Sequence, residues 1–246
     1  MGCISRQPNG AISTEEAISY AKVCEDCGYD AVSSVAPFYF KFSFEEIKNH
    51  YFSIAESISL PMFVYNIPAL SGVTLSVDNI SEFLKSDKFA GVKYTSSDFF
   101  GMERIKTRHP DKIVYNGYDE MFLSELSMGA DGGIGSTYNF MAEKFVKIKD
   151  CFAAGDLKTA YEVQKEVNAV VEALMKVGVL AGVKEVLRQT GIDVGVLRAP
   201  FAPLDKKQQE YVAKNIIPYL SRLHFLESKI VFPLYYYIKQ FYKILI

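Results

Sequence analysis

The sequence predicts an α/β protein built on a parallel sheet, and two observations support this. Short apolar segments rich in Val, Ile and Tyr alternate along the chain with longer segments of helical periodicity. Residues that start or stop helices stand at the borders between them. Strands that alternate with helices pair in parallel through right-handed crossovers. The chain has 246 residues, 49% of them hydrophobic, which is enough for one large domain of this class or two small ones.

The βα elements follow in order along the first part of the chain. Five strands are predicted, at residues 29–37, 60–68, 89–96, 112–119 and 131–139. Ser43 and Glu46 form a capping box that begins the helix after the first of these strands. Gly28 and Gly129 stand where helices should end before the next strand. Residues 1–11 show no strand pattern, so no strand is expected there.

The pattern changes after residue 155. Three helical segments follow, at residues 157–178, 179–191 and 206–223. We therefore expect a βα domain over residues 1–155, a helical subdomain over 156–224 and an atypical hydrophobic tail over 225–246. Pro233, Lys239 and Lys243 interrupt the tail, which argues against a transmembrane helix because about 20 apolar residues would be needed.

Charge and cysteine content exclude several classes of function. The net charge of −2 gives no electrostatic reason to bind nucleic acid or an anionic membrane. Cys24 and Cys27 form a CxxC pair, but no second pair or histidine cluster completes a metal site. We expect two thiols on a helix face. Reduced thiols and the absence of an apolar N-terminal segment favour a cytoplasmic protein.

Lys93 interrupts an apolar strand in the segment "FAGVKYTS". Strand side chains alternate, so Lys93 and Thr95 share one face while Val92 and Tyr94 share the other. We expect Val92 and Tyr94 to pack on helices and Lys93 to point into the sheet interior. Burial lowers the pKa of a lysine, and the free amine attacks carbonyls to form a Schiff base. A lysine that reaches solvent or pairs with a carboxylate explains this segment alone equally well.

Three neighbouring strand ends carry further polar groups. Tyr65 ends the strand before Lys93 and could move protons beside an imine, although it could also be a core tyrosine with a satisfied hydroxyl. Asp119 and Glu120 follow the next strand and suit hydrogen bonding to sugar hydroxyls, although they also suit the start of a helix. Ser136 in "GIGSTYN" adds a polar lining at the last strand.

Four segments together resemble the N-acetylneuraminate lyases, a group of Schiff-base aldolases that also includes dihydrodipicolinate synthase. They are "YNIPALSGV", "GVKYTSSDFFGMERI", "YNGYDE" and "GADGGIGSTYN". The resemblance runs from about Ile12 to about residue 220 and implies the fold of the (β/α)8 TIM-barrel family with C-terminal helices. It also implies reversible cleavage of N-acetylneuraminate to pyruvate and N-acetylmannosamine. No metal or cofactor is implied beyond a covalent imine on Lys93.

The resemblance also assigns roles to residues. Lys93 would form the imine and Tyr65 would transfer protons. The residues that would hold the sugar portion are Thr95, Gly117, Asp119, Glu120 and Ser136. Tyr39 would lie near the subunit contact of a homo-oligomer. Leu70 stands where dihydrodipicolinate synthases usually carry an arginine, which argues against a dicarboxylic partner, whereas adjacent Asp119 and Glu120 argue for a polyhydroxylated one.

The sequence departs from the family pattern at its start. The five predicted strands correspond to barrel strands four to eight, so we expect an incomplete barrel. The Gly-Ser/Thr-Thr-Gly-Glu loop that grips the pyruvate carboxylate is not found, because "GST" at 135–137 belongs to the last strand. One alternative is therefore a catalytically impaired, truncated family member or interaction fragment, poorly soluble by itself. Another is a pyruvate-dependent Schiff-base aldolase of the dihydrodipicolinate synthase type.

Overall fold

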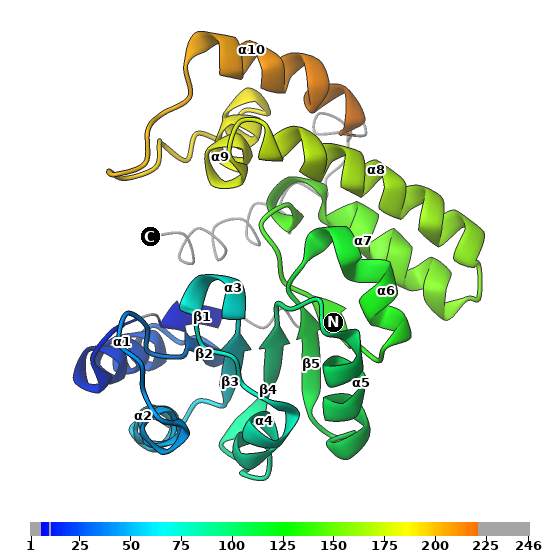
Figure 1. Ribbon diagram of the computed structural model, residues 1–246. Coiled ribbons are helices and arrows are strands. Elements are labelled where there is room, and N and C mark those ends of the chain that lie inside the picture. Colours follow the sequence, from blue (N-terminus) through cyan, green and yellow to red (C-terminus); the bar gives the residue numbers. More distant parts are fainter. Residues whose placement is uncertain (1–5, 10, 221–246) are drawn as a thin grey trace. The chain divides into compact units, whose positions relative to one another are not determined.

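The computed structural model describes residues 6–9 and 11–220 (Figure 1). These residues form two compact units. The described residues up to Gly117, together with Ser127–Gly132, make the first unit. Tyr118–Leu126 and the described residues from Gly133 onward make the second. The domain boundaries expected at residues 155 and 224 stay predictions, and the tail over 225–246 lies outside the described residues.

A single sheet runs through the strands in chain order. Its strands are β1 (Arg6–Asn9), β2 (Ala31–Val35), β3 (Met62–Asn66), β4 (Phe89–Tyr94), β5 (Ile113–Asn116) and β6 (Gly132–Gly133). Each pair from β1–β2 to β4–β5 is parallel. Four of the five predicted strands are thus confirmed. The fifth, predicted over 131–139, is a strand only at Gly132–Gly133, because Tyr138 and Asn139 already belong to the helix over Tyr138–Ala153. The expectation of no strand before residue 11 is wrong, because β1 pairs with β2 along its whole length.

Helices connect the strands of the first unit. They are α1 (Thr14–Asp26), α2 (Phe44–Glu56), α3 (Pro68–Ser71), α4 (Val77–Leu84) and α5 (Phe99–Arg108). The predicted capping box of α2 is confirmed, since Ser43 N donates to Glu46 Oε2 at 2.7 Å and Glu46 N donates to Ser43 Oγ at 3.3 Å. Gly28 and Gly129 both have positive φ after their helices, as expected.

One face of the sheet packs against these helices. Val64, Val92 and Val114 lie in one row across β3, β4 and β5, and all three are fully buried. They belong to one hydrophobic core with helical residues such as Phe83 of α4 and Ile105 of α5. The expectation that Val92 faces the helices is therefore confirmed, and Lys93, the next residue along β4, leaves the other face.

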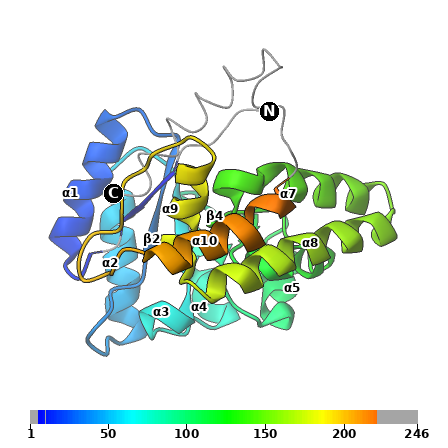
Figure 2. The ribbon, with the colours of Figure 1, turned by 90° about the horizontal axis from the view of Figure 1, so that it is seen from above.

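Helices dominate the second unit. They are η1 (Asp119–Met121), α6 (Phe122–Ser127), α7 (Tyr138–Ala153), α8 (Leu157–Met175), α9 (Val179–Gln189), α10 (Lys206–Asn215) and η2 (Ile217–Tyr219). α7 and α8 lie side by side (Figure 1 and Figure 2). Their apolar faces share a core that includes Phe145, Val167 and Leu174. The helical segments predicted at 157–178 and 179–191 are thus confirmed. The one predicted at 206–223 is confirmed as a helix over Lys206–Asn215 with a 3-10 turn at Ile217–Tyr219, and its last three residues lie outside the described part of the chain.

Candidate active site

Lys93 and Tyr65 lie next to each other on the face of the sheet that is turned away from the helices. They pair in register between β3 and β4, so their side chains leave the sheet in the same direction. Lys93 Nζ lies over the Tyr65 ring, 4.0 Å from the ring centroid. Both side chains are half-buried. The structure therefore brings the predicted amine and the predicted phenol together, and an amine beside a phenol can both attack a carbonyl and exchange protons.

Thr95 and Gly117 meet at the ends of β4 and β5. Thr95 N donates to Asn66 O at 2.8 Å, and Gly117 N donates to Tyr94 O at 3.0 Å, which fixes both backbones. The approach is close enough that a Cβ on Gly117 would lie 1.7 Å from Thr95 Oγ1. Thr95 is only 4% exposed, and its hydroxyl has no hydrogen-bond partner among the described residues. It therefore offers one buried hydroxyl two residues beyond Lys93.

Tyr39 lies in the loop between β2 and α2. It is 83% exposed and meets the edge of the Phe40 ring, with the ring centroids 4.9 Å apart. It is also the one described residue other than glycine with a positive φ, at 81°. That conformation costs an ordinary residue about 1–2 kcal/mol. The predicted subunit-contact role of Tyr39 stays a prediction.

In the second unit the carboxylate of Asp119 is buried and engaged. Asp119 Oδ2 accepts hydrogen bonds from Thr137 N at 2.9 Å and from Thr137 Oγ1 at 2.6 Å. Its side chain is 5% exposed, and its backbone carbonyl accepts from Gln164 Nε2 at 3.1 Å. The charges of Asp119 and Glu125 add to burial in raising the pKa of Tyr138. Asp119 therefore ties the turn before α7 to η1.

The other two predicted residues of this unit are more accessible. Glu120 is half-buried, and its carboxylate makes no hydrogen bond or ion pair within the described part of the chain. Ser136 uses its carbonyl to accept from Asn139 Nδ2 at 2.7 Å, which leaves its hydroxyl without a partner among the described residues. Both side chains are thus available to bind polar groups of a ligand.

Two residues near these positions were not predicted from the sequence. Tyr115 of β5 pairs in register with Lys93, on the side opposite Tyr65. Alternation in "KIVYN" puts Ile113 and Tyr115 on one face of their strand, but only the register between strands shows that Tyr115 lies beside Lys93. Thr137 is the partner of Asp119, 18 residues away in the chain. No local pattern predicts such a contact.

The described residues hold no group of three His, Cys, Asp or Glu side chains that could bind a metal ion. Cys24 is buried in α1, and burial raises the pKa of its thiol to about 11, whereas Cys27 is exposed at the end of the same helix. Across residues 6–9 and 11–220, no helix is long and apolar enough to cross a membrane.

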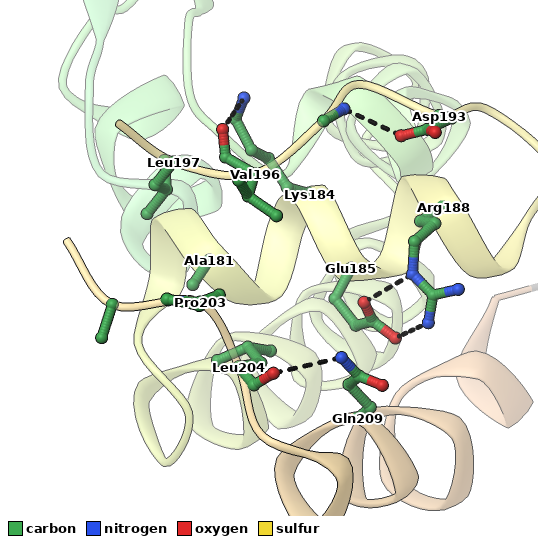
Figure 3. Close-up of a pocket in the computed structure, with 12 residues that line it drawn as sticks. Ala181, Lys184, Glu185, Arg188, Asp193, Val196, Leu197, Pro203, Leu204 and Gln209 are labelled. Carbon is green, nitrogen blue, oxygen red and sulfur yellow. Dashed lines mark hydrogen bonds and ion pairs between the residues drawn. The ribbon is translucent and has the colours of Figure 1, made fainter. Parts of the chain in front are cut away.

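A pocket of about 390 Å³ lies within the second unit, between α9, residues 193–204 and the start of α10 (Figure 3). Its charged groups satisfy one another or the backbone. Lys184 Nζ donates to Val194 O at 3.1 Å. Arg188 makes a two-pronged ion pair with Glu185, in which its Nε and Nη2 each donate to one carboxylate oxygen. None of the predicted site residues lines it. These contacts support the loop over residues 193–204 against α9.

Comparison with known proteins identifies the family of this chain. The model of the Dihydrodipicolinate synthetase family matches residues 7–217. N-acetylneuraminate lyase 2 of Escherichia coli O6:H1 is 47% identical over 207 residues, which cover 83% of this chain and 68% of that protein. N-acetylneuraminate lyase of Salmonella paratyphi B is 48% identical over 200 residues, covering 80% of this chain and 67% of that protein.

Solved structures agree with the sequence relatives. CdNal from Clostridium difficile, in complex with mannosamine, matches with a TM-score of 0.85 and 34% identity, over 87% of this chain and 74% of that chain. Dihydrodipicolinate synthase DapA-2 from Bacillus anthracis matches with a TM-score of 0.80 and 29% identity, over 85% and 72%. The predicted fold class is thus confirmed, and the chain belongs to the dihydrodipicolinate synthetase family.

Proposed function

We propose that this protein is a Schiff-base aldolase that reversibly cleaves N-acetylneuraminate to N-acetylmannosamine and pyruvate. One observation carries the proposal: Lys93 Nζ lies 4.0 Å from the centroid of the Tyr65 ring, on register-paired strands. The relatives at 47% and 48% identity, which are named N-acetylneuraminate lyases, support the choice of substrate.

The chemistry requires an amine and a group that moves protons. The Lys93 amine adds to the C2 carbonyl of the open-chain sugar acid, and loss of water gives an imine, which is protonated. The C3–C4 bond then breaks, and its electron pair moves into the iminium to form an enamine of pyruvate. Tyr65 gives its phenol proton to the hydroxyl that leaves as water during imine formation, and the resulting phenolate then takes the proton from the C4 hydroxyl, so that N-acetylmannosamine leaves as an aldehyde. Protonation of the enamine carbon and hydrolysis release pyruvate and regenerate the amine.

The remaining residues are assigned to binding. We assign Thr95 and Gly117, at the ends of β4 and β5, to binding the substrate beside its reacting carbon. The Thr95 hydroxyl is buried and has no hydrogen-bond partner within the described residues. Glu120 and Ser136 are assigned to sugar hydroxyls. Asp119 supports them through the turn that its carboxylate holds at Thr137. Assembly as a homo-oligomer, with Tyr39 at the contact, belongs to the same proposal.

A second candidate is an aldolase that joins pyruvate to a different partner, in the manner of a dihydrodipicolinate synthase. The structure named dihydrodipicolinate synthase from Bacillus anthracis, at 29% identity, favours it. Leu70 favours the sugar instead. It stands on α3 directly after the Tyr65 strand, is 81% exposed and offers no cation for a second carboxylate. We therefore retain the sugar acid as the substrate.

The test is release of pyruvate from N-acetylneuraminate by the full chain, compared with two single variants. Lys93→Ala should abolish release. Lys88→Ala, which removes a lysine just before the same strand, should leave the rate unchanged. Equal release by Lys93→Ala and the unaltered chain would refute the proposal. Imine formation with pyruvate but no release from the sugar acid would favour the second candidate, and neither activity would favour an impaired family member.

A further inference from the structure

Tyr115 flanks Lys93 on the side opposite Tyr65. Register pairs Lys93 with Tyr65 of β3 on one side and with Tyr115 of β5 on the other. Paired residues of a parallel sheet leave the same face from strands about 4.8 Å apart. The lysine therefore stands in a row between two tyrosines, although only Tyr65 was expected beside it.

Phe63 and Tyr115 meet across β4 at the level below Lys93. Their ring centroids lie 5.8 Å apart, although the strands that carry them are separated by β4. The residue between them is Gly91, which pairs in register with Phe63 and has no side chain to separate the rings. A Cβ on Gly91 would lie 1.9 Å from Ile113 O, so the position is closed to larger residues.

The Tyr115 ring is also bounded on its other side. A Cβ on Gly132 of β6 would lie 3.4 Å from Tyr115 Cε1, which is ordinary packing distance. Phe63 is 2% exposed and Tyr115 is half-buried, so the ring contact is buried on the Phe63 side. We call the two rings of Phe63 and Tyr115, which close over Gly91, the aromatic floor.

We propose that Tyr115, supported by Phe63, is a positioning residue for Lys93, and this rests on the proposed function. The lysine stem has four rotatable bonds and leaves the sheet directly above the aromatic floor. Tyr115 blocks the rotamers that would swing the stem towards β5, so the amine stays over the Tyr65 ring. The ring, not the hydroxyl, does this, because the contacts that define the floor are ring contacts.

The expected consequence is a rate effect with little change in pyruvate binding. Misplacing a reacting group by about 1 Å can cost up to about 100-fold in rate. Loss of the Tyr115 ring should therefore lower the maximal rate of imine formation between about 10-fold and 100-fold. The pyruvate concentration that gives half the maximal rate should change less than about threefold, because Tyr115 is not proposed to touch pyruvate.

The test measures borohydride trapping of pyruvate by the full chain, as a function of pyruvate concentration. Tyr115→Ala should lower the maximal rate, and Tyr115→Phe, which keeps the ring, should restore most of it. An unchanged maximal rate in Tyr115→Ala would overturn the inference. So would an equal loss in Tyr115→Phe, which would assign the effect to the hydroxyl. Failure of the unaltered chain to trap pyruvate would refute the proposed function itself.

A second pair of variants covers the case in which Tyr115→Ala does not fold. Phe63→Leu weakens the aromatic floor from the other strand. Phe89→Leu is its matched control, since Phe89 is also fully buried in a neighbouring strand but contacts the helical rings of Phe52 and Phe83. Slower trapping in Phe63→Leu than in Phe89→Leu, at equal content of folded protein, supports the positioning role. Equal rates in these two variants overturn it.

Discussion

Gly117→Ala should destabilise the first unit at the point where β4 and β5 end. The added Cβ would lie 1.7 Å from Thr95 Oγ1, 2.6 Å from Thr95 Cβ and 3.0 Å from Thr95 Cα. Neither residue can retreat easily. Thr95 N is held by Asn66 O at 2.8 Å, and Gly117 N is held by Tyr94 O at 3.0 Å. The substitution must therefore break one of these hydrogen bonds or shift a buried strand end.

The magnitude follows from these contacts. Overpacking a buried site costs about 1–3 kcal/mol, and a lost hydrogen bond adds about 1 kcal/mol. We expect Gly117→Ala to lower the free energy of unfolding by about 3 kcal/mol. Thr95→Ala removes the nearest atom but leaves the Cβ at 2.6 Å. The double variant should therefore lose less than the sum of the two single variants, with a coupling of about 1 kcal/mol.

The assay is urea denaturation of the four proteins of this cycle, followed by circular dichroism. The Thr95→Ala variant serves as the control for loss of the threonine alone. A Gly117→Ala protein within about 0.5 kcal/mol of the unaltered chain would refute the packing argument. Additive losses in the double variant would show that the two residues do not meet.

Two further predictions concern charge. Burial lowers the pKa of His50, partly offset by Glu15, so the unfolded chain binds the proton more readily than the folded one. The free energy of unfolding should therefore be highest above about pH 6.5 and fall as the pH drops below it. His50→Gln should make this fall smaller in urea titrations at about pH 7.5 and 5.5. An equally steep fall in the variant would contradict the assignment to His50. Asp119→Asn weakens the hydrogen bonds from Thr137, so cleavage of N-acetylneuraminate should fall about 10- to 150-fold while pyruvate trapping stays nearly constant. A matching loss of trapping would place Asp119 in the environment of the lysine instead of the sugar site.

Local chemistry made much of the fold predictable. The capping box at Ser43 and the glycines Gly28 and Gly129 mark helix ends through the backbone groups that they satisfy, and the structure confirms each. β1 escaped prediction because "RQPN" is short, polar and contains a proline, so it has no apolar alternation. Its pairing with β2 is a tertiary contact that these four residues alone do not predict.

The candidate site also contains residues that local sequence predicts and residues that only tertiary contacts reveal. Side-chain alternation along β4 alone predicts that Lys93 and Val92 lie on opposite faces of the sheet, without knowledge of any other strand. Tyr115 required the register between β4 and β5, which depends on how the whole sheet packs. The segment "NGYDE" suggested that Asp119 binds sugar hydroxyls or begins a helix, and only the fold shows that its carboxylate accepts two hydrogen bonds from Thr137.

The central claim is that Lys93 forms an imine with a 2-oxo acid. The most direct measurement is borohydride reduction of the full chain with pyruvate, followed by peptide mapping by mass spectrometry. Lys88, which precedes the same strand, serves as the internal comparison. The account predicts a reduced pyruvyl adduct on Lys93 alone, and no adduct in Lys93→Ala. An adduct on another lysine, or one that persists in Lys93→Ala, would contradict it.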